Sequence, residues 1–524
     1  MDAQPGHMSD ITERALASVS TPETVETRIG TLRFRDGIPD AGTCEKVYDH
    51  LDLSYGVQAY LAGLPGVSMY AWRKGLLDAG VADNSVLIYT GLMDGETLLL
   101  TGNADTVYFF TFVDLSQGPV VMQLPPGCLG AVNDMWFRWV TDVGVPGPDR
   151  GTGGSYLLVP PGYTGPLPEG GMFVAHCSTT HVCMFARSFL EDGDPAPAVA
   201  RVKETLRIHP YTPGGLGSSV ASFLQGEGPL ATAAQPPDAQ VFVEGSGAAM
   251  NTVPPNDYTF YEFLDALVQD EPVDAVDPEG AGAFRAIGIA KGKEFKPGGR
   301  LRTLLEEAVA IGNATGRTLG FRARPEEDFA YYEGSGWFNP LFIGGYDWTV
   351  PPPQVTATGV EPYPPTTGRA LNSRTAFFYL AIGVTPSMCM RLPGIGSQYL
   401  VAALDSAGEP VDGGRGYQVT LPAGIPAGRF WSLTLYDNQT RSMLRTPQRY
   451  PRAGSQDYPS PAATASDDGS TTIHFAPTRP EGVAEGNWIQ TVPGKGWFTV
   501  LRLYSPGQPF FDRSWRPTEI EPTA

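Results

Sequence analysis

Short apolar runs that end in turn-forming residues dominate this chain and restrict what it can fold into. From SVLIYTGL at residue 85 onward, stretches rich in Val, Ile, Leu, Phe and Tyr end in Gly, Pro, Asn or Asp. Runs with this spacing are typical of the strands of a β-sandwich or barrel. The 63 Gly and 49 Pro residues of the chain supply the turns. We therefore predict a mainly β fold with a helical layer.

The predicted strands fall into two regions, which we interpret as two β domains, 85–195 and 370–510. In the second region, strands in GSQYLVAAL, YQVTL, RFWSLTLYD, TTIHFAP and GWFTVLRLYSP alternate with turns such as PAGIPAG. The strands predicted in the first region are 85–91, 96–101, 106–113, 119–124, 130–141, 155–159, 171–175 and 181–188.

Helical periodicity occupies the remaining stretches. EKVYDHLDLSYGVQAYLAGLP places Val47, Leu51 and Tyr55 on one stripe, and MYAWRKGLLDAGV resembles a second short helix, so residues 44–84 are predicted to form a helical hairpin. Three further helical patterns predict a helical connecting region over 196–350. The other predicted segments are an N-terminal arm over 1–43, a Pro-rich linker over 351–369 and a C-terminal tail over 511–524.

Charge and cysteine content exclude several classes of partner. The formal net charge is -20 and no Lys/Arg-rich run occurs, so we expect neither nucleic acid nor an anionic membrane surface as a partner. We find no stretch of 18 consecutive apolar residues and no basic segment followed by an apolar one at the N-terminus. The five Cys residues are odd in number and mostly scattered, which favours reduced thiols over a disulfide framework. We expect a soluble, cytoplasmic protein.

Many ordered segments carry a family resemblance. LAGLPGVSMYAWRKGL, TGNADTVYFFTFVDLSQGPVVMQLPPG, NDMWFRWVTDVG, NTVPPNDYTFYEFL, FWSLTLYDNQTRSML and NWIQTVPGKGWFTVLRLYSP are among those that resemble bacterial and fungal proteins combining the domain-of-unknown-function families 1254 and 1214. The resemblance runs from about Cys44 to Pro522. It implies an N-terminal β-sandwich of family 1254, a helical middle, and a C-terminal β-sandwich of family 1214 with jelly-roll character. It implies little about chemistry.

AHCSTTHVC, residues 175–183, gathers four side chains that could bind a metal: His176, Cys177, His181 and Cys183. A strand through 177–183 would place three of them on one face, but zinc sites favour C-x-x-C or H-x₃-H pairs completed from elsewhere. The corresponding stretch of the family is usually apolar and aromatic. We therefore predict buried thiols and a hydrogen-bonded histidine, with these four residues as the ligands of an alternative, metal-dependent enzyme.

The candidate catalytic residues form two sets of three. Asp134, Arg138 and Asp142 share one face of NDMWFRWVTD whether it forms a strand or a helix. The structural interpretation is an Arg–carboxylate bridge. The functional interpretation is an Arg that orients an anionic or carbonyl oxygen, with Asp134 as a proton acceptor. The second group is Tyr436, Asp437 and Arg441. Tyr436 ends the strand FWSLTLY, and the other two lie in or beside the loop that follows it at the rim of the second β domain.

The polar turn NADTVY offers further side chains, Asn103, Asp105 and Tyr108, but an Asx-type turn explains them equally well. Neither GRGYQV nor PGKGW has the strand-to-helix context of a phosphate-binding loop, so no cofactor is predicted.

The function predicted from these features is a cofactor-independent enzyme, a hydrolase or lyase, for a small organic molecule. We expect its cleft between the β domains or at their rim, with the six charged and tyrosine residues named above as catalytic groups. The alternatives are a non-catalytic ligand-binding or assembly protein and the metal-dependent enzyme. A homo-oligomer is expected because β-rich proteins of this size commonly form symmetric assemblies.

Overall fold

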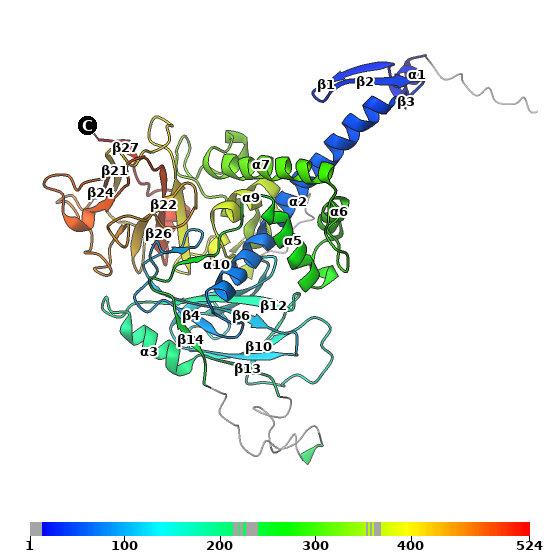
Figure 1. Ribbon diagram of the computed structural model, residues 1–524. Helices are drawn as coiled ribbons and strands as arrows, with labels where there is room; N and C mark the ends of the chain where they lie inside the picture. The colour runs from blue at the N-terminus through cyan, green and yellow to red at the C-terminus, as the bar shows by residue number, and fades with distance from the viewer. Residues whose placement is uncertain are drawn as a thin grey trace, which may run out of the picture.

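Two β-sandwiches and a layer of helices make up the computed structural model of this chain (Figure 1). The structure describes residues 13–212, 239–352 and 368–523, with short pieces at 220, 224–226, 355–356 and 359–360. Helices take up 28% and strands 27% of the residues. The predicted fold class, mainly β with a helical layer, is confirmed.

The first sandwich contains a six-stranded and a four-stranded sheet that pack around a core of aliphatic and aromatic side chains. Strands β13 and β14 come from the region predicted to be helical, because the exposed edges of both sheets pair with the chain that follows α3 (Ala196–Thr205). The six-stranded sheet has the order β14 (Phe242–Glu244), β4 (Val86–Ile88), β6 (Val107–Asp114), β12 (His181–Ser188), β8 (Cys128–Asp134), β9 (Trp139–Gly144). The four-stranded sheet has the order β11 (Phe173–His176), β10 (Gly154–Val159), β7 (Val120–Leu124), β13 (Arg207–Pro210).

Side-chain alternation gives the six-stranded sheet two buried faces. On β6, Phe109 and Val113 point into the sandwich core, whereas Phe110 and Phe112 point outward against the helices. The predicted strand 130–141 is wrong in one respect. A turn at 135–138 splits it into β8 and β9, which pair as a hairpin.

The predicted helical hairpin over 44–84 is also wrong, because α2 (Ala41–Asp78) is one continuous helix with Pro65 inside it. A proline in a helix interior removes a hydrogen bond and normally kinks or breaks the helix. Here the second half of α2 is buried against the six-stranded sheet and other helices, and that packing outweighs the local cost. Gly66 allows the close approach, because a Cβ there would lie 2.5 Å from the Trp136 ring.

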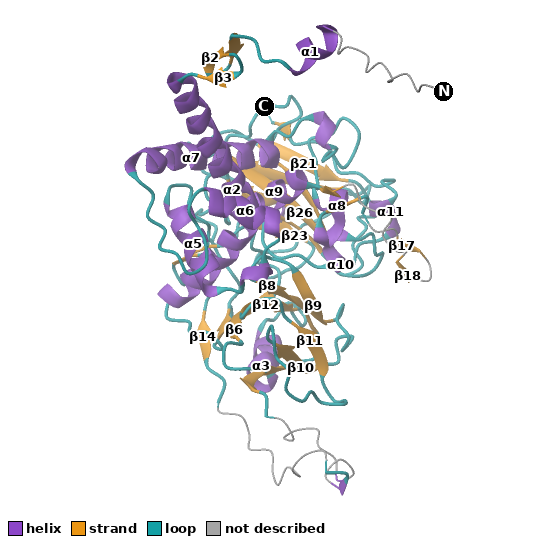
Figure 2. Cartoon of the chain, turned by 90° about the vertical axis from the view of Figure 1, so that its right-hand side faces the viewer, coloured by secondary structure: helices purple, strands orange, loops and turns teal. Residues whose placement is uncertain are grey.

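Several other helices pack against α2 (Figure 2). Helix α7 makes the most extensive contact with it, and two short helices lie near the second sandwich. The bounds are α5 (Thr259–Asp270), α6 (Pro278–Ala286), α7 (Gly299–Phe321), α8 (Leu341–Gly344), α9 (Leu371–Leu380) and α10 (Pro386–Cys389). Much of the predicted Pro-rich linker, residues 353–354, 357–358 and 361–367, lies outside the described residues. In the described part of the linker, β17 (Val355–Thr356) pairs with β18 (Gly359–Val360). β19 (Gly368–Arg369) pairs with β16 (Thr349–Val350), which lies just before the linker.

The second sandwich contains two four-stranded sheets around a separate core. The predicted tail 511–524 belongs to this sandwich, because Trp515 and Ile520 are buried in its core and β27 pairs with β21. The sheet facing the first sandwich has the order β20 (Ser397–Ala402), β26 (Trp497–Tyr504), β22 (Trp431–Asp437), β23 (Arg452–Gly454). The outer sheet has the order β25 (Trp488–Gln490), β24 (Thr471–Ala476), β21 (Tyr417–Leu421), β27 (Glu521–Pro522).

The N-terminal arm stands away from the body at the exposed end of α2 (Figures 1 and 2). We define the arm as residues 13–48: α1 (Glu13–Val19), the small sheet β1 (Thr24–Thr27), β2 (Gly30–Arg35) and β3 (Ile38–Pro39), and the start of α2. Residues 1–12 of the predicted arm lie outside the described residues. Within the described part of the chain, no helix has the length and apolar character needed to cross a membrane.

Candidate active site between the two sandwiches

A cavity of about 120 Å³ lies where the outer faces of two sheets, one from each sandwich, approach each other. The first sandwich contributes β6, β8 and β12, and the second contributes β20 and β26. Helices α2, α8, α9 and α10 and the loop 99–102 close the remaining sides. A volume of this size holds a small organic molecule rather than one or two waters.

Most of the lining is apolar, but several strands carry polar groups into it. Tyr108 on β6 and Arg187 on β12 are cross-strand partners in the first sandwich. Tyr399 on β20 lies opposite Arg502 on β26 in the second sandwich. Cross-strand partners have Cβ atoms about 5 Å apart, so each sheet contributes one tyrosine–arginine pair.

A chain of hydrogen bonds joins the two sandwiches across the cavity. The Arg187 guanidinium donates from Nη2 to Ser397 Oγ at 2.8 Å. Ser397 Oγ lies 2.6 Å from the Tyr399 hydroxyl, and either oxygen can donate. In the first sandwich, the side-chain amide of Asn103 donates to the Tyr108 hydroxyl. One serine and three tyrosines, Tyr108, Tyr399 and Tyr504, therefore lie around the Arg187 guanidinium.

Arg502 carries the second guanidinium of the site, and its side chain is buried. It donates to the Thr101 carbonyl oxygen at 2.6 Å and to Thr434 Oγ1 at 3.3 Å. It also lies over the Tyr436 ring, 5.5 Å from the ring centre. Among the residues that the structure describes, neither Arg187 nor Arg502 has a carboxylate within 4.0 Å.

A buried carboxylate near the site, that of Asp105, forms an ion pair with a different arginine, Arg452. Its Oδ1 lies 2.8 Å from Arg452 Nε, with both side chains fully buried, and its Oδ2 accepts from Ser432 Oγ at 2.6 Å. The local Asx-type turn is present as well, because the Asp105 amide donates to Asn103 Oδ1 at 2.9 Å. Asp105 thus links the first sandwich to the second. Its ion pair is with Arg452, so neither Arg187 nor Arg502 has a carboxylate in contact.

These cations change the chemistry of Tyr399. Burial by itself raises the pKa of a tyrosine hydroxyl, because it penalises the charged form. At Tyr399 the positive charge of Arg187 and the hydrogen bond with Ser397 outweigh burial, so the pKa lies below its ordinary value. The neighbouring Tyr108 and Tyr436 keep raised pKa values, because burial dominates there. Tyr399 is therefore the hydroxyl of the site best suited to exchange a proton.

Asp134 and Arg138, two of the predicted catalytic residues, form an ion pair with each other. Arg138 Nε donates to Asp134 Oδ2 at 2.6 Å, and the backbone amide of Trp136 donates to Asp134 Oδ1 at 2.8 Å. Ser178 Oγ donates to the same carboxylate at 2.9 Å. These bonds close the turn between β8 and β9, which is the bridge that the structural interpretation predicts.

Asp142, the third member of that group, lies apart from the other two on β9. One of its oxygens is buried without a hydrogen-bond partner. Burial raises the pKa of its carboxyl to about 7, and hydrogen bonding from Thr385 and Trp139 offsets only part of that rise. Because Thr385 lines the cavity, Asp142 lies behind the cavity wall rather than in it.

The second predicted group is also absent from the lining. The Tyr436 hydroxyl donates to the Gly102 carbonyl oxygen at 2.6 Å, which places its ring beside Arg502. Asp437 accepts from Lys495 Nζ at 2.6 Å and from the turn that follows it. Arg441 is buried, with its guanidinium over the Tyr379 ring and donating to carbonyl oxygens. The structure does not bring the six predicted residues into one pocket, and their catalytic role stays a prediction.

The four residues of the alternative metal site, His176, Cys177, His181 and Cys183, are separated as well. Cys177 packs in the core of the first sandwich, whereas Cys183 faces the helical layer and His176 is exposed. Residues 177–180 form a bend rather than a strand. The predicted strand through 177–183, which would have placed Cys177, His181 and Cys183 on one face, is therefore not formed. All five cysteines are unpaired thiols. No group of three or more His, Cys, Asp or Glu side chains in the described part of the chain could hold a metal ion.

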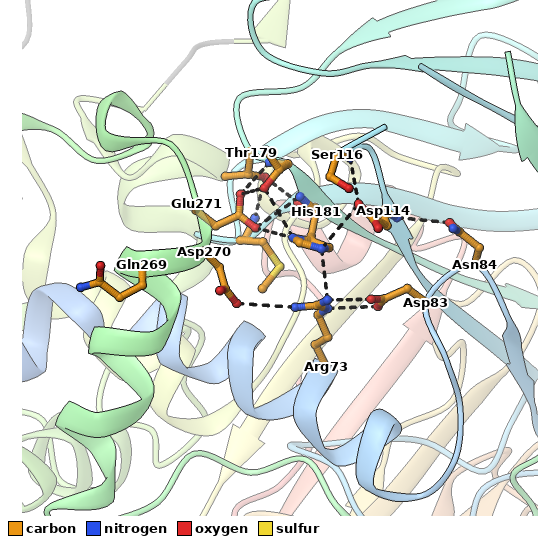
Figure 3. Close-up of polar contacts among 12 residues, drawn as sticks. Arg73, Asp83, Asn84, Asp114, Ser116, Thr179, His181, Gln269, Asp270 and Glu271 are labelled. Atoms are coloured by element: carbon orange, nitrogen blue, oxygen red, sulfur yellow. Dashed lines mark hydrogen bonds and ion pairs between the residues drawn. The ribbon is translucent and has the colours of Figure 1, made fainter. Parts of the chain in front are cut away.

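His181 takes part in a different polar cluster, shown in Figure 3. Its Nδ1 lies 2.8 Å from Glu271 Oε1, and its Nε2 lies 3.1 Å from Arg73 Nη2. Arg73 also forms an ion pair with Asp83 at 2.6 Å. Both ring nitrogens of His181 are occupied, as expected for a hydrogen-bonded histidine. The cluster joins α2 and the end of α5 to the first sandwich.

Sequence reasoning missed Arg187, Tyr399 and Arg502, although the two arginines each left a signal. In HVCMFARS, Arg187 shares the face of Cys183 and Phe185. In WFTVLRLY, Arg502 lies on the face of Phe498 and Val500 in the same way. An arginine in register with apolar residues of a buried strand was the available signal.

Two family models match the chain. Residues 84–210 match "Protein of unknown function (DUF1254)" and residues 396–508 match "Protein of unknown function (DUF1214)". The predicted resemblance is confirmed. The two families occur in the predicted order, and the cavity lies between strands of the two matched regions.

A solved structure resembles the chain in fold. The VPA0106 protein from Vibrio parahaemolyticus has a TM-score of 0.50 and 18% sequence identity, covering 90% of this chain and 100% of its own. An uncharacterized protein from Burkholderia cenocepacia has a TM-score of 0.37 and 12% identity, covering 92% of this chain and 97% of its own. The search of curated proteins found no match.

Proposed function

We propose that this chain is a cofactor-independent enzyme that acts on a small organic molecule in the cavity between the two sandwiches. The observation that carries the proposal is the hydrogen-bonded chain from Arg187 through Ser397 to Tyr399 at an otherwise apolar cavity wall. Charged and polar groups in such a setting act strongly, because little water is present to screen them.

In the proposed mechanism Tyr399 exchanges a proton with the substrate. The lowered pKa of its hydroxyl makes the phenolate accessible as a base, and the same group returns the proton as an acid. Arg187 and Arg502 stabilise negative charge that develops on a substrate oxygen. Proton abstraction of this kind is the first step of many lyase reactions, so we favour a lyase over a hydrolase.

The test begins with a thermal-shift screen of the purified chain against a metabolite panel, because a ligand of the native state raises the melting temperature. Each hit is then assayed for turnover with the wild type and with Tyr399→Phe, which removes only the hydroxyl. We expect Tyr399→Phe to lower kcat by about 100-fold or more. Tyr48→Phe, at a tyrosine 62% exposed on the arm, is the matched control.

A turnover rate that survives in Tyr399→Phe would contradict the proposed mechanism. Binding of several hits with no turnover of any would favour the second candidate, a ligand-binding protein that uses the same cavity. The absorbance of tyrosinate gives an independent check. One tyrosine of the wild type should ionise below the ordinary range, and that ionisation should be missing in Tyr399→Phe.

We also propose a homo-oligomer and a cytoplasmic location. The arm supports the first, because Ile38, Val47 and Tyr48 expose apolar surface on a segment that stands away from the body. Removing residues 1–40 together with Val47→Ser and Tyr48→Ser should lower the number of copies per particle, measured by light scattering, if copies associate through the arm. An unchanged number of copies would contradict that. The five unpaired thiols support a reducing compartment, which cell fractionation would test.

A further inference from the structure

We infer that the substrate of the cavity is a small organic carboxylate with an apolar body, whose carboxylate group is received by Arg187 and Arg502. This inference rests on the proposed function and specifies its substrate class. It follows from the charge, the donor geometry and the lining of the same cavity.

Among the described residues, the two cavity arginines have no carboxylate in contact, and Asp105 acts on Arg502 only from a longer distance. Three guanidinium groups lie around the contact between the sandwiches: those of Arg452 and Arg502, which are buried, and that of Arg187, which is half-buried. Asp105 pairs with Arg452. Among the described residues, the groups that contact Arg187 are hydroxyls and aromatic rings. A buried cation without a counter-ion is costly, and a bound carboxylate would supply the missing negative charge.

The donors suit a carboxylate better than a phosphate. A guanidinium presents a planar fork of N–H groups that matches the two oxygens of a carboxylate. Phosphate sites commonly use backbone N–H groups of a Gly-rich loop or the N-terminus of a long helix, often with a lysine. None of the described residues that line the cavity is a lysine, and its two guanidinium groups are side chains of the strands β12 and β26.

The rest of the lining defines the body of the molecule. Phe110, Phe185, Phe377 and Phe498 surround the space next to the polar groups. A carboxylate held by the arginines would place its neighbouring carbon close to the Tyr399 hydroxyl, because Tyr399 lies opposite Arg502 and hydrogen-bonds with the serine that binds Arg187. The inferred reaction therefore removes or adds a proton near the carboxylate group.

The test compares matched ligands on the full chain by titration calorimetry. The probes are phenylacetate and 4-methylpentanoate, their neutral amides, and inorganic phosphate. We expect a carboxylate to bind at least about 10-fold more tightly than its amide. Arg187→Gln should abolish that preference, whereas Arg479→Gln, at an exposed arginine, should preserve it. Thermal unfolding shows whether each variant is folded, and the comparison in the wild type stands without any variant.

Carboxylate binding also has a spectroscopic consequence. A second negative charge beside Arg187 should raise the pKa of Tyr399, so tyrosinate absorbance should fall on binding of a carboxylate and stay unchanged with the amide. Equal binding of carboxylate and amide would overturn the inference and leave the proposed cavity enzyme in place. Preference for phosphate, or no binding of any carboxylate probe, would overturn the inference too. The proposed function fails separately, if turnover of the panel hits survives Tyr399→Phe.

Discussion

Asp142 provides a sharp test of the packing between the first sandwich and α10. Its carboxyl is buried, one oxygen has no partner, and its pKa is about 7 in the folded chain. In the unfolded chain the pKa returns to the ordinary value of 3.8. The folded state therefore binds the proton more tightly than the unfolded state does.

The sign of the pH dependence follows from that difference. The stabilising contribution of protonated Asp142 is fully present below the unfolded pKa and is lost as the pH rises toward and through the folded pKa. Between about pH 5 and about pH 9 the wild type should lose about 3 kcal/mol of unfolding free energy through this group. Asp142→Asn mimics the neutral carboxyl and should not lose it.

The assay is denaturant unfolding of the wild type and Asp142→Asn over that pH range, with Asp467→Asn at an exposed aspartate as the control. The stability of Asp142→Asn relative to the wild type should rise by about 3 kcal/mol from about pH 5 to about pH 9. Because other groups titrate in both proteins, the difference isolates Asp142. A difference that is independent of pH, or one that falls as pH rises, would refute the reasoning.

Two further predictions concern the contacts that hold the chain together. Asp105→Ala should cost about 3–5 kcal/mol of unfolding free energy, because it leaves Arg452 buried without its partner, and a loss below about 1 kcal/mol in denaturant unfolding would contradict the buried ion pair. Gly66→Ala should destabilise the chain by about 1–3 kcal/mol, because its new Cβ would overlap the Trp136 ring. Gly170→Ala, with open space around it, should change the melting temperature little, and equal effects of the two substitutions would show that α2 packs less closely.

Local signals predicted local structure well. Residues 181–188 were predicted as a strand and form β12 with the same bounds, because alternating apolar residues between turns specify a buried strand. The turn chemistry around Asn103 and the Asp134–Arg138 bridge also follow from neighbours in sequence. In each case the atoms that interact are a few residues apart.

The errors arose where distant segments decide the outcome. Pro65 predicts the end of a helix, but burial of the helix on both sides of it keeps α2 continuous. β13, β14 and β27 are short, and each is a strand only because the edge of a sheet formed elsewhere pairs with it. Such pairing leaves little pattern in the short segment itself.

The sequence by itself determined the alternation of strands and turns, the two β regions and the main helices, because these depend on periodicity and turn residues within short windows. Only the tertiary structure decided the site. Arg187 and Tyr399 are more than two hundred positions apart in the chain, and they meet because the outer faces of two sandwiches pack against each other. The cavity, its positive charge and the lowered pKa of Tyr399 all result from that packing.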